Sequence, residues 1–320
     1  VMDICKLCGS ELIRVRKKWV CSNEECSFQV VIGQNSWFKD LVKESNGWNE
    51  INFNDVPSVI SNQYKRLHKL IRNGEVYGAQ IKVKDIYEVE LKFLILIILS
   101  EAFCDDSKKQ LYSSIIYNLL DGNPSLGVWL SLGKQILTLN SDDKDPIYII
   151  LKSLIDLDNT EKIVFWRNSN IGHGALMPIE LEELHISLSG KIKSILSNFV
   201  KNQKFYSKIR LQVKIKDKFV DLNGGKLDIC KNSKSTELFI TTRQKRFKLI
   251  PLIQFYENSI YFFDSYMKKR YVVSYLEYTS NIKRKTHDKM LSNMFSSVKK
   301  LLNIESVNIK ADEGLFIEER

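Results

Sequence analysis

The sequence has few residues that interrupt regular structure and no apolar stretch long enough to cross a bilayer. Only 5 of its 320 residues are proline and 44% are hydrophobic, which excludes a disordered chain and allows each larger unit to bury a core. The longest purely apolar run in the helical part extends from Phe93 to Leu99, whereas a membrane helix needs roughly 20 residues. We therefore expect no membrane partner and, from the length, two or three folding units.

From the first residues of the sequence we also expect no secretory leader. The chain begins Val1-Met2-Asp3 and shows no basic stretch followed by an apolar segment and a small-residue cleavage site. Six cysteines without such a leader argue against a disulfide framework, because the cytosol keeps thiols reduced. The expected location is therefore cytoplasmic.

Negative charge is scarce in the last third of the chain. Residues 201–320 contain 25 Lys and Arg against 13 Asp and Glu, whereas residues 36–200 contain 18 against 21. The net charge of +10 therefore comes from the C-terminal segment. This segment is the candidate surface for a polyanion such as RNA.

Four of the six cysteines lie close together near the N-terminus, as two pairs separated by twelve residues. The pairs have the spacings Cys-x2-Cys and Cys-x4-Cys, and they are Cys5 with Cys8 and Cys21 with Cys26. Two such cysteine knuckles joined by a short hairpin can place four thiolates around a tetrahedral Zn²⁺. The pattern resembles a zinc ribbon over residues 1–35, with one structural zinc, and Gly9 suits the turn after the first knuckle. The alternative is a set of buried cysteines without metal.

Residues 36–200 have the apolar spacing of helices. One stripe comprises Ile60, Tyr64, Leu67 and Ile71, and a longer one extends from Leu181 to Phe199. Further helices are predicted at 82–103, 108–120, 126–139, 146–155 and 160–172, with breaks rich in Gly, Pro and Asp between several of them. This segment is predicted to be an all-α bundle.

Residues 201–320 alternate β-branched and aromatic residues with charged ones. Strands are predicted at 209–215, 236–241, 247–256, 259–264 and 271–278, with a turn at Asn223-Gly224-Gly225 and a closing helix at 288–302. The expected fold class is therefore α+β and multidomain. A zinc ribbon (1–35), a helical bundle (36–200) and a basic β-rich domain (201–320) would follow one another.

The most informative stretch runs from Phe165 to Gly174 and contains Arg167, Asn168 and His173. Histidine titrates near neutral pH and can accept the proton of a ribose 2′-hydroxyl. Arginine stays charged and offers a planar fork to phosphate oxygens, and asparagine can orient either partner. No carboxylate cluster of the kind that holds Mg²⁺ accompanies these residues, so no catalytic metal is expected.

This stretch resembles the signature of the HEPN superfamily. That signature is an arginine, usually followed by a polar residue, and then a histidine at the end of a helix. Here five residues separate Arg167 from His173, and Gly172 and Gly174 flank the histidine as in many bacterial defence and toxin proteins. The resemblance implies an endoribonuclease that acts in anti-phage defence or growth arrest and is controlled by a phage-derived trigger or an inhibitory partner.

Within one straight helix the arginine and the histidine cannot meet. Six residues correspond to about 9 Å of rise and an offset of about 120°, so Arg167 and His173 point in different directions unless the helix ends between them. HEPN proteins pair two subunits around one cleft, and the resemblance therefore implies a homodimer or a higher homo-oligomer. The alternative is that Arg167 and His173 only cap a helix end.

Two cationic runs in the C-terminal segment are candidate RNA-binding residues. They comprise Arg243, Lys245 and Arg246, and Lys268, Lys269 and Arg270. Cations beside aromatic residues on strand edges can hold single-stranded RNA. The alternative is a solvated face that protects strand edges from aggregation.

The leading hypothesis is thus a metal-independent endoribonuclease that cuts RNA by attack of the 2′-hydroxyl. Two alternatives remain open. The helical bundle can serve only for dimerisation in a non-catalytic nucleic-acid-binding or scaffold protein. In the other, the zinc ribbon recognises a phage component and the rest of the chain is the effector.

Overall fold

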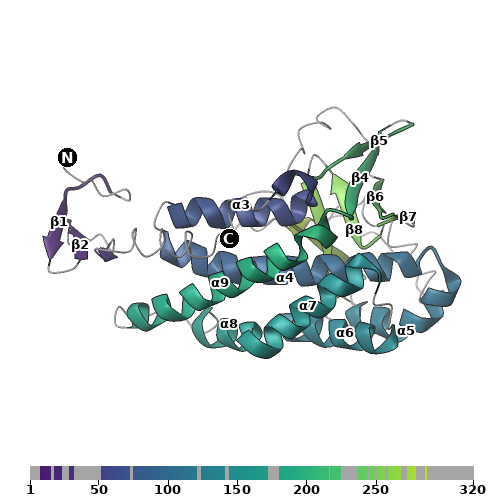
Figure 1. Cartoon of the computed structure of the whole chain (residues 1–320), viewed down its shortest axis with the longest axis horizontal. Coiled ribbons are helices and arrows are strands. Elements are labelled where there is room, and N and C mark those ends of the chain that lie inside the picture. Colours follow the sequence, from purple (N-terminus) through teal and green to yellow (C-terminus); the bar gives the residue numbers. More distant parts are fainter. Residues whose placement is uncertain are drawn as a thin grey trace. The chain divides into compact units, whose positions relative to one another are not determined.

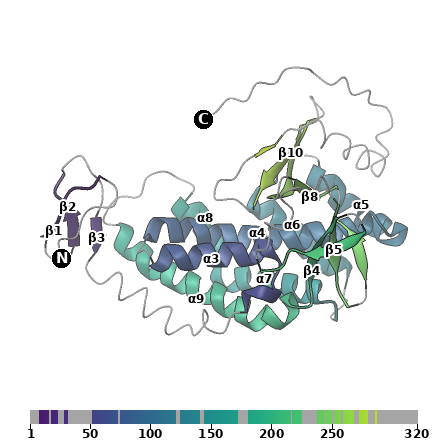
Figure 2. The same cartoon turned by 90° about the horizontal axis from the view of Figure 1, so that it is seen from above.

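The computed structural model in Figures 1 and 2 describes most of the helical part of the chain and parts of its sheets. The described residues are 8–15, 18–23, 29–31, 52–72, 75–120, 124–140, 144–171, 180–215, 217–224, 237–243, 245–249, 251–256, 259–267, 272–278 and 285–286.

Helices and antiparallel sheets both occur in the described residues, so the α+β class is confirmed. The helices are η1 (Phe53–Asp55), α3 (Ser58–Arg72), α4 (Val76–Ala102), α5 (Asp106–Leu120), α6 (Leu126–Leu139), α7 (Pro146–Glu161), α8 (Ile163–Ile171) and α9 (Glu180–Tyr206). The strands are β1 (Leu12–Val15), β2 (Lys18–Cys21), β3 (Gln29–Val31), β4 (Arg210–Ile215), β5 (Lys218–Asp221), β6 (Leu238–Thr241), β7 (Arg246–Lys248), β8 (Ile253–Tyr256), β9 (Ser259–Met267), β10 (Val272–Glu277) and β11 (Lys285–Thr286). Within the described part of the chain, no helix has the length and apolar character that a bilayer-spanning segment requires.

The chain divides into two compact units that do not follow its order. The first unit comprises residues 1–51, 63–86 and 161–201, and the second comprises residues 52–62, 87–160 and 202–320. Helices α3, α4 and α9 contribute residues to both units. The boundaries predicted at residues 35 and 200 stay predictions.

The apolar stripe predicted before residue 72 forms the buried face of α3. Its four residues are Ile60, Tyr64, Leu67 and Ile71, and each is at most 3% exposed. In the first unit, the ring of Tyr64 lies 4.2 Å from the ring of Phe199 on α9, measured between centroids. The two predicted stripes therefore meet in one core.

Close packing of three helices forms the core of the second unit. A Cβ atom on Gly133 of α6 would lie 3.3–3.4 Å from side-chain methyl groups of Ile95 on α4 and of Leu151 and Ile155 on α7. Helix α6 has the predicted bounds, and the side chain of Ser125 accepts a hydrogen bond from the Val128 amide at its start. A small residue at position 133 thus lets α6 approach its two neighbours.

Two four-stranded antiparallel sheets complete the second unit, with the strand orders β5-β4-β6-β7 and β11-β10-β9-β8. Both sheets pack against the C-terminal half of α4 (Figure 2). The Ser100 hydroxyl donates to the Leu249 carbonyl, and the buried Lys92 ammonium donates to the Tyr278 hydroxyl at 3.2 Å. The helical and β-rich parts of the second unit therefore share one core.

The strand predicted over residues 247–256 is wrong as one continuous strand. It divides into β7 and β8, which belong to different sheets. Between them, the amides of Leu252 and Ile253 both donate to the Leu249 carbonyl, and Pro251 has no N–H for a ladder hydrogen bond. A tight turn therefore interrupts an otherwise apolar run.

The turn predicted at Asn223 and Gly224 anchors an earlier segment of the chain. Gly224 has φ +73°, and a Cβ atom there would lie 3.0 Å from the backbone of Asn54. The Gly224 amide donates to the Val56 carbonyl, and the Asn223 side chain donates to the Asp55 carbonyl at 2.9 Å. Residues 52–57 are thereby held beside strand β4.

Candidate functional site

Helix α8, which carries the predicted catalytic arginine, follows α7 after one residue in an unusual backbone conformation. Lys162 has φ +52°, in the left-handed region that non-glycine residues rarely adopt. The carboxylate of Glu161 accepts hydrogen bonds from Lys191 at 3.0 Å and from Ser194 at 2.8 Å, and Lys191 also donates to the Glu161 carbonyl. Two residues of α9 thus hold the end of α7 and the start of α8.

The same contacts change the pKa of Glu161. Burial on its own would raise the pKa of this carboxyl group. The hydrogen bonds from Ser194 and Lys191, together with the charge of Lys191, outweigh burial and lower the pKa below its ordinary value. Glu161 is therefore ionised in the folded protein at neutral pH.

Arg167 and Asn168 are in contact near the C-terminal end of α8. The Arg167 Nη1 atom donates to the Asn168 Oδ1 atom at 2.8 Å, and Asn168 is exposed. Arg167 is half-buried, its Nε atom is buried without a hydrogen-bond partner, and it forms no ion pair in the described part of the chain. Among the described residues, no carboxylate therefore pairs with the positive charge of Arg167.

His173, the third member of the predicted site, lies outside the described residues. It follows the last residue of α8, Ile171, by two positions. The structure therefore describes the contact between Arg167 and Asn168, and the meeting of Arg167 with His173 stays a prediction.

An exposed aromatic residue lies beside this pair and was missed in the sequence. Phe165 is 72% exposed, the largest exposed fraction among the large hydrophobic residues of the described chain. It precedes Asn168 by three positions, which places both residues on one face of α8. The sequence offered a signal, because Ile163 and Trp166 lie three positions apart and predict one inner face of this short helix, and both are buried in the structure.

The cationic run before β7 meets carboxylates of the helices. Lys245 Nζ lies 2.7 Å from both carboxylate oxygens of Glu101 and 3.0 Å from Asp145 Oδ2. Lys108 Nζ also pairs with Glu101 at 2.7 Å, and Glu101 and Asp145 are both buried residues. Lys245 therefore links the β6–β7 connection to α4 and to the start of α7.

These carboxylates also determine the pKa of Lys245. Burial would lower the pKa of the ammonium group, but hydrogen bonds and charges from Glu101 and Asp145 outweigh burial and raise it above the ordinary value. Lys245 is thus a fixed cation whose charge is already balanced.

The two arginines of the same run differ from Lys245. Arg243 is exposed and forms no ion pair with a described residue. Arg246 donates from Nε to the Thr241 hydroxyl at 2.9 Å, and its guanidinium carbon lies 4.0 Å from the centroid of the Phe219 ring. Both keep a charge that a polyanion can use. Lys268, Lys269 and Arg270 lie outside the described residues.

Two of the four N-terminal cysteines lie together. Cys8 Sγ and Cys21 Sγ are 3.3 Å apart, and Gly9 beside them has φ +75°, as the predicted turn requires. Two sulfurs bound to one tetrahedral Zn²⁺ at about 2.3 Å would lie about 3.8 Å apart, so this pair is close to the geometry of shared ligands. Cys5 and Cys26 lie outside the described residues.

No protein-family model matches the sequence, and comparisons with curated proteins and with solved structures gave no match.

Proposed function

We propose that the chain is a metal-independent endoribonuclease of the HEPN type. The observation that carries the proposal is the state of Arg167, which is half-buried, forms a hydrogen bond with Asn168 and has no carboxylate partner in the described part of the chain. Leaving a half-buried cation without a counter-charge costs stability, and an anionic ligand compensates for that cost. A phosphate group of RNA is the anion that the fork of arginine fits best.

In the proposed reaction each residue has one role. His173 removes the proton from a ribose 2′-hydroxyl, and the oxygen attacks the adjacent phosphorus. Arg167 stabilises the charge that develops on the phosphate oxygens, and Asn168 fixes the orientation of its guanidinium group. The bond from phosphorus to the 5′-oxygen breaks, this oxygen takes up a proton, and a 2′,3′-cyclic phosphate remains on the other product.

The proposed enzyme is a homodimer in which two copies of the motif face one cleft, as the resemblance to HEPN proteins implies. The exposed Phe165 lies beside Asn168 and is available to a partner or to a base of the substrate. In cells, the enzyme would act in the cytoplasm in anti-phage defence or growth arrest, under the control of a phage-derived trigger or an inhibitory partner.

Cleavage of a single-stranded RNA without added Mg²⁺, by protein whose proposed zinc site is loaded, tests the mechanism. His173→Ala should lower the rate by about 10²–10⁴-fold and leave RNA binding nearly intact, because proton transfer contributes a factor of this size. Asn168→Ala should have a smaller effect. Lys193→Ala is the matched control, because Lys193 is an exposed cation of the same unit.

The end groups of the products show whether the 2′-hydroxyl is the attacking group. A 2′,3′-cyclic phosphate or the 3′-phosphate derived from it is expected. A requirement for Mg²⁺, or wild-type rates in both the His173 and Arg167 variants, would contradict the mechanism. Sequencing RNA ends from cells that express wild type or His173→Ala would identify the substrate.

We also propose that Cys5, Cys8, Cys21 and Cys26 hold one structural Zn²⁺ per chain. The contact between Cys8 and Cys21, which belong to different knuckles, supports this proposal. A segment of about 35 residues has too small a hydrophobic core to fold without a bound metal ion.

Metal analysis should find one equivalent of zinc in wild type and less in Cys8→Ser and Cys21→Ser. Less than half an equivalent in wild type, with the segment folded after chelation, would contradict the proposal.

A further inference from the structure

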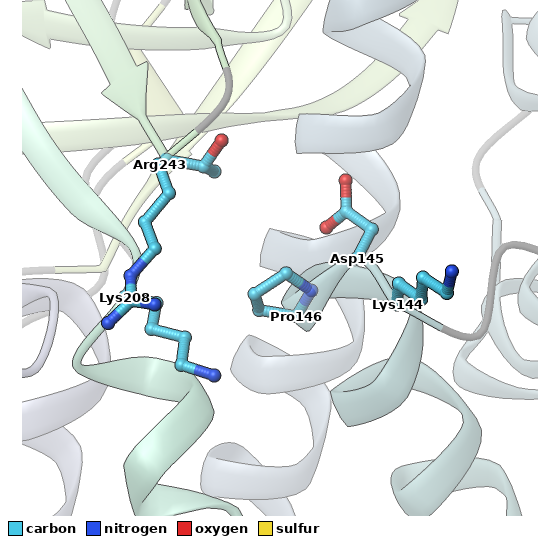
Figure 3. Close-up of a pocket in the computed structure, with 6 residues that line it drawn as sticks. Lys144, Asp145, Pro146, Lys208 and Arg243 are labelled. Carbon is cyan, nitrogen blue, oxygen red and sulfur yellow. The ribbon is translucent and has the colours of Figure 1, made fainter.

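A pocket of about 180 Å³ lies in the second unit, where three separate parts of the chain meet (Figure 3). The segment at the start of α7 contributes Lys144, Asp145 and Pro146, the connection between α9 and β4 contributes Lys208, and the loop after β6 contributes Thr242 and Arg243. Water occupies about 30 Å³ per molecule in the liquid, so the pocket has room for a small polar group rather than a large ligand.

Two cations lie together on one side of this pocket. In Figure 3 the side chains of Arg243 and Lys208 lie on the same side of Pro146, and Lys144 lies on the other side with its ammonium pointing away from them. Arg243 and Lys208 form no ion pair with a described residue, and the nearest aromatic contact of Lys208 is the Phe205 ring at 5.1 Å. Two like charges that line one small pocket repel each other, and an anion bound in the pocket would reduce that repulsion.

Asp145 is unable to act as that anion. Its Oδ1 atom accepts a hydrogen bond from the Ile147 amide at 2.9 Å, and its Oδ2 atom pairs with Lys245 at 3.0 Å. Asp145 is the one acidic residue among the lining residues, and Lys245, which does not line the pocket, offsets its charge. The lining thus keeps a positive charge.

The first two residues of α7 offer no free backbone N–H group to the pocket. Pro146 has no N–H group, and the Ile147 amide is already bonded to Asp145. The cationic side chains of Arg243 and Lys208 are therefore the groups that would hold an anion in the pocket, because the Thr242 hydroxyl already donates to the Lys245 carbonyl.

We propose that this pocket binds a terminal phosphate group, either of a free nucleotide or of an RNA end, through Arg243 and Lys208. A phosphate monoester carries between one and two negative charges at neutral pH and matches two cations. A phosphodiester within a strand has one charge and a substituent on both sides, so a small pocket favours the end of a ligand. The site is separate from Arg167, and the proposal stands without the ribonuclease mechanism.

Titration of the full chain with inorganic phosphate, AMP and adenosine tests the site. The Arg167→Ala background slows RNA cleavage, and Arg167 does not line the pocket. Phosphate and AMP should bind, and adenosine should not. Arg243→Gln and Lys208→Gln should each weaken phosphate binding about tenfold or more, since a charge-assisted hydrogen bond contributes on that order. Arg243→Lys should retain most of the affinity.

Lys134→Gln is the matched control, because Lys134 is an exposed cation of α6 in the same unit and does not line the pocket. Its affinity for phosphate should equal that of the parent protein, and the thermal melting of all variants should be compared. Equal affinity of the parent protein and the Arg243→Gln/Lys208→Gln double variant, or no phosphate binding at all, would overturn the proposal.

Two single-stranded RNAs with a 5′-phosphate or a 5′-hydroxyl separate the possible sources of the phosphate. If the pocket takes RNA ends, the phosphorylated strand binds more tightly, and the difference disappears in the double variant. If it takes free nucleotides, AMP competes with inorganic phosphate while the two strands bind equally. Either outcome supports a phosphate pocket and names its ligand.

Discussion

Arg167 on α8 and Lys245 before β7 are both cations of predicted RNA-contacting motifs, but their surroundings differ. Lys245 pairs with Glu101 and Asp145, two carboxylates that are nearly buried. Arg167 forms a hydrogen bond with an exposed amide and has no carboxylate partner in the described part of the chain. A basic residue in a basic run is therefore not by itself a free charge. What matters is which groups the fold brings to it.

The largest difference is expected in catalysis. Arg167→Ala should lower the rate of RNA cleavage about 10²–10³-fold, the usual cost of removing one group that stabilises a transition-state charge. The melting temperature should change little, because no ion pair is lost. Single-turnover cleavage and thermal melting measure the two effects. If the Arg167→Ala variant melts several degrees lower but cleaves RNA at the wild-type rate, Arg167 has a structural role and not a catalytic one.

For the free energy of unfolding, we expect the larger effect at Lys245 and the smaller one at Arg167. Lys245→Ala leaves Glu101 and Asp145 without their shared cation, and we expect the free energy of unfolding to fall by about 2 kcal/mol. Lys248→Ala is the control, because the pair between Lys248 and Glu237 is exposed and contributes at most about 1 kcal/mol. Urea denaturation measures both. Equal losses in the two variants would show that burial of the carboxylates is not the cause.

The salt dependence of RNA affinity distinguishes free cations from paired ones within the same run. Neutralising Arg243, Lys245 and Arg246 together should weaken RNA binding, and the single variants divide the effect. Arg243→Ala and Arg246→Ala should each reduce the slope of log affinity against log salt by about one, because each removes one phosphate contact. Lys245→Ala should leave the slope unchanged. If the slope of log affinity against log salt is unchanged in the triple variant, RNA binds at another surface of the protein.

The smallest effect concerns the acid stability of the junction before α8. The pKa of Glu161 is lower in the folded chain than the unfolded value of about 4.3, so ionised Glu161 stabilises the fold above that pH. This contribution disappears as pH falls through the folded pKa. Melting temperatures of wild type and Glu161→Gln should therefore differ at about pH 6 and converge toward about pH 3. A constant difference would contradict the assignment.

Regular patterns in the sequence were enough to locate most helices. Helix α6 has the predicted bounds of 126–139, and the stripe of α3 is buried as predicted. The bounds of α6 and the buried stripe of α3 both follow from spacing along one segment, because apolar residues on one face of a helix recur every three or four positions. The turn at Gly224 was likewise visible, since glycine accepts a positive φ at low cost.

Other features depend on residues that are far apart in the chain. Glu101 and Lys245 are 144 positions apart, and no local pattern indicates that they meet. Lys208 lies near Arg243 only because the end of α9 and the loop after β6 border the same pocket. The break between β7 and β8 also needed the fold, because Pro251 separates strands of two different sheets.

Spacing and residue type thus identify helices, turns and the candidate motif of Arg167 and Asn168, because these depend on neighbours along the chain. Whether a charge is free is decided in three dimensions, because an ion pair depends on distance in space. Lys245 and Arg243, two residues apart in one loop, illustrate the difference. One is held by helix carboxylates, and the other lines a positively charged pocket.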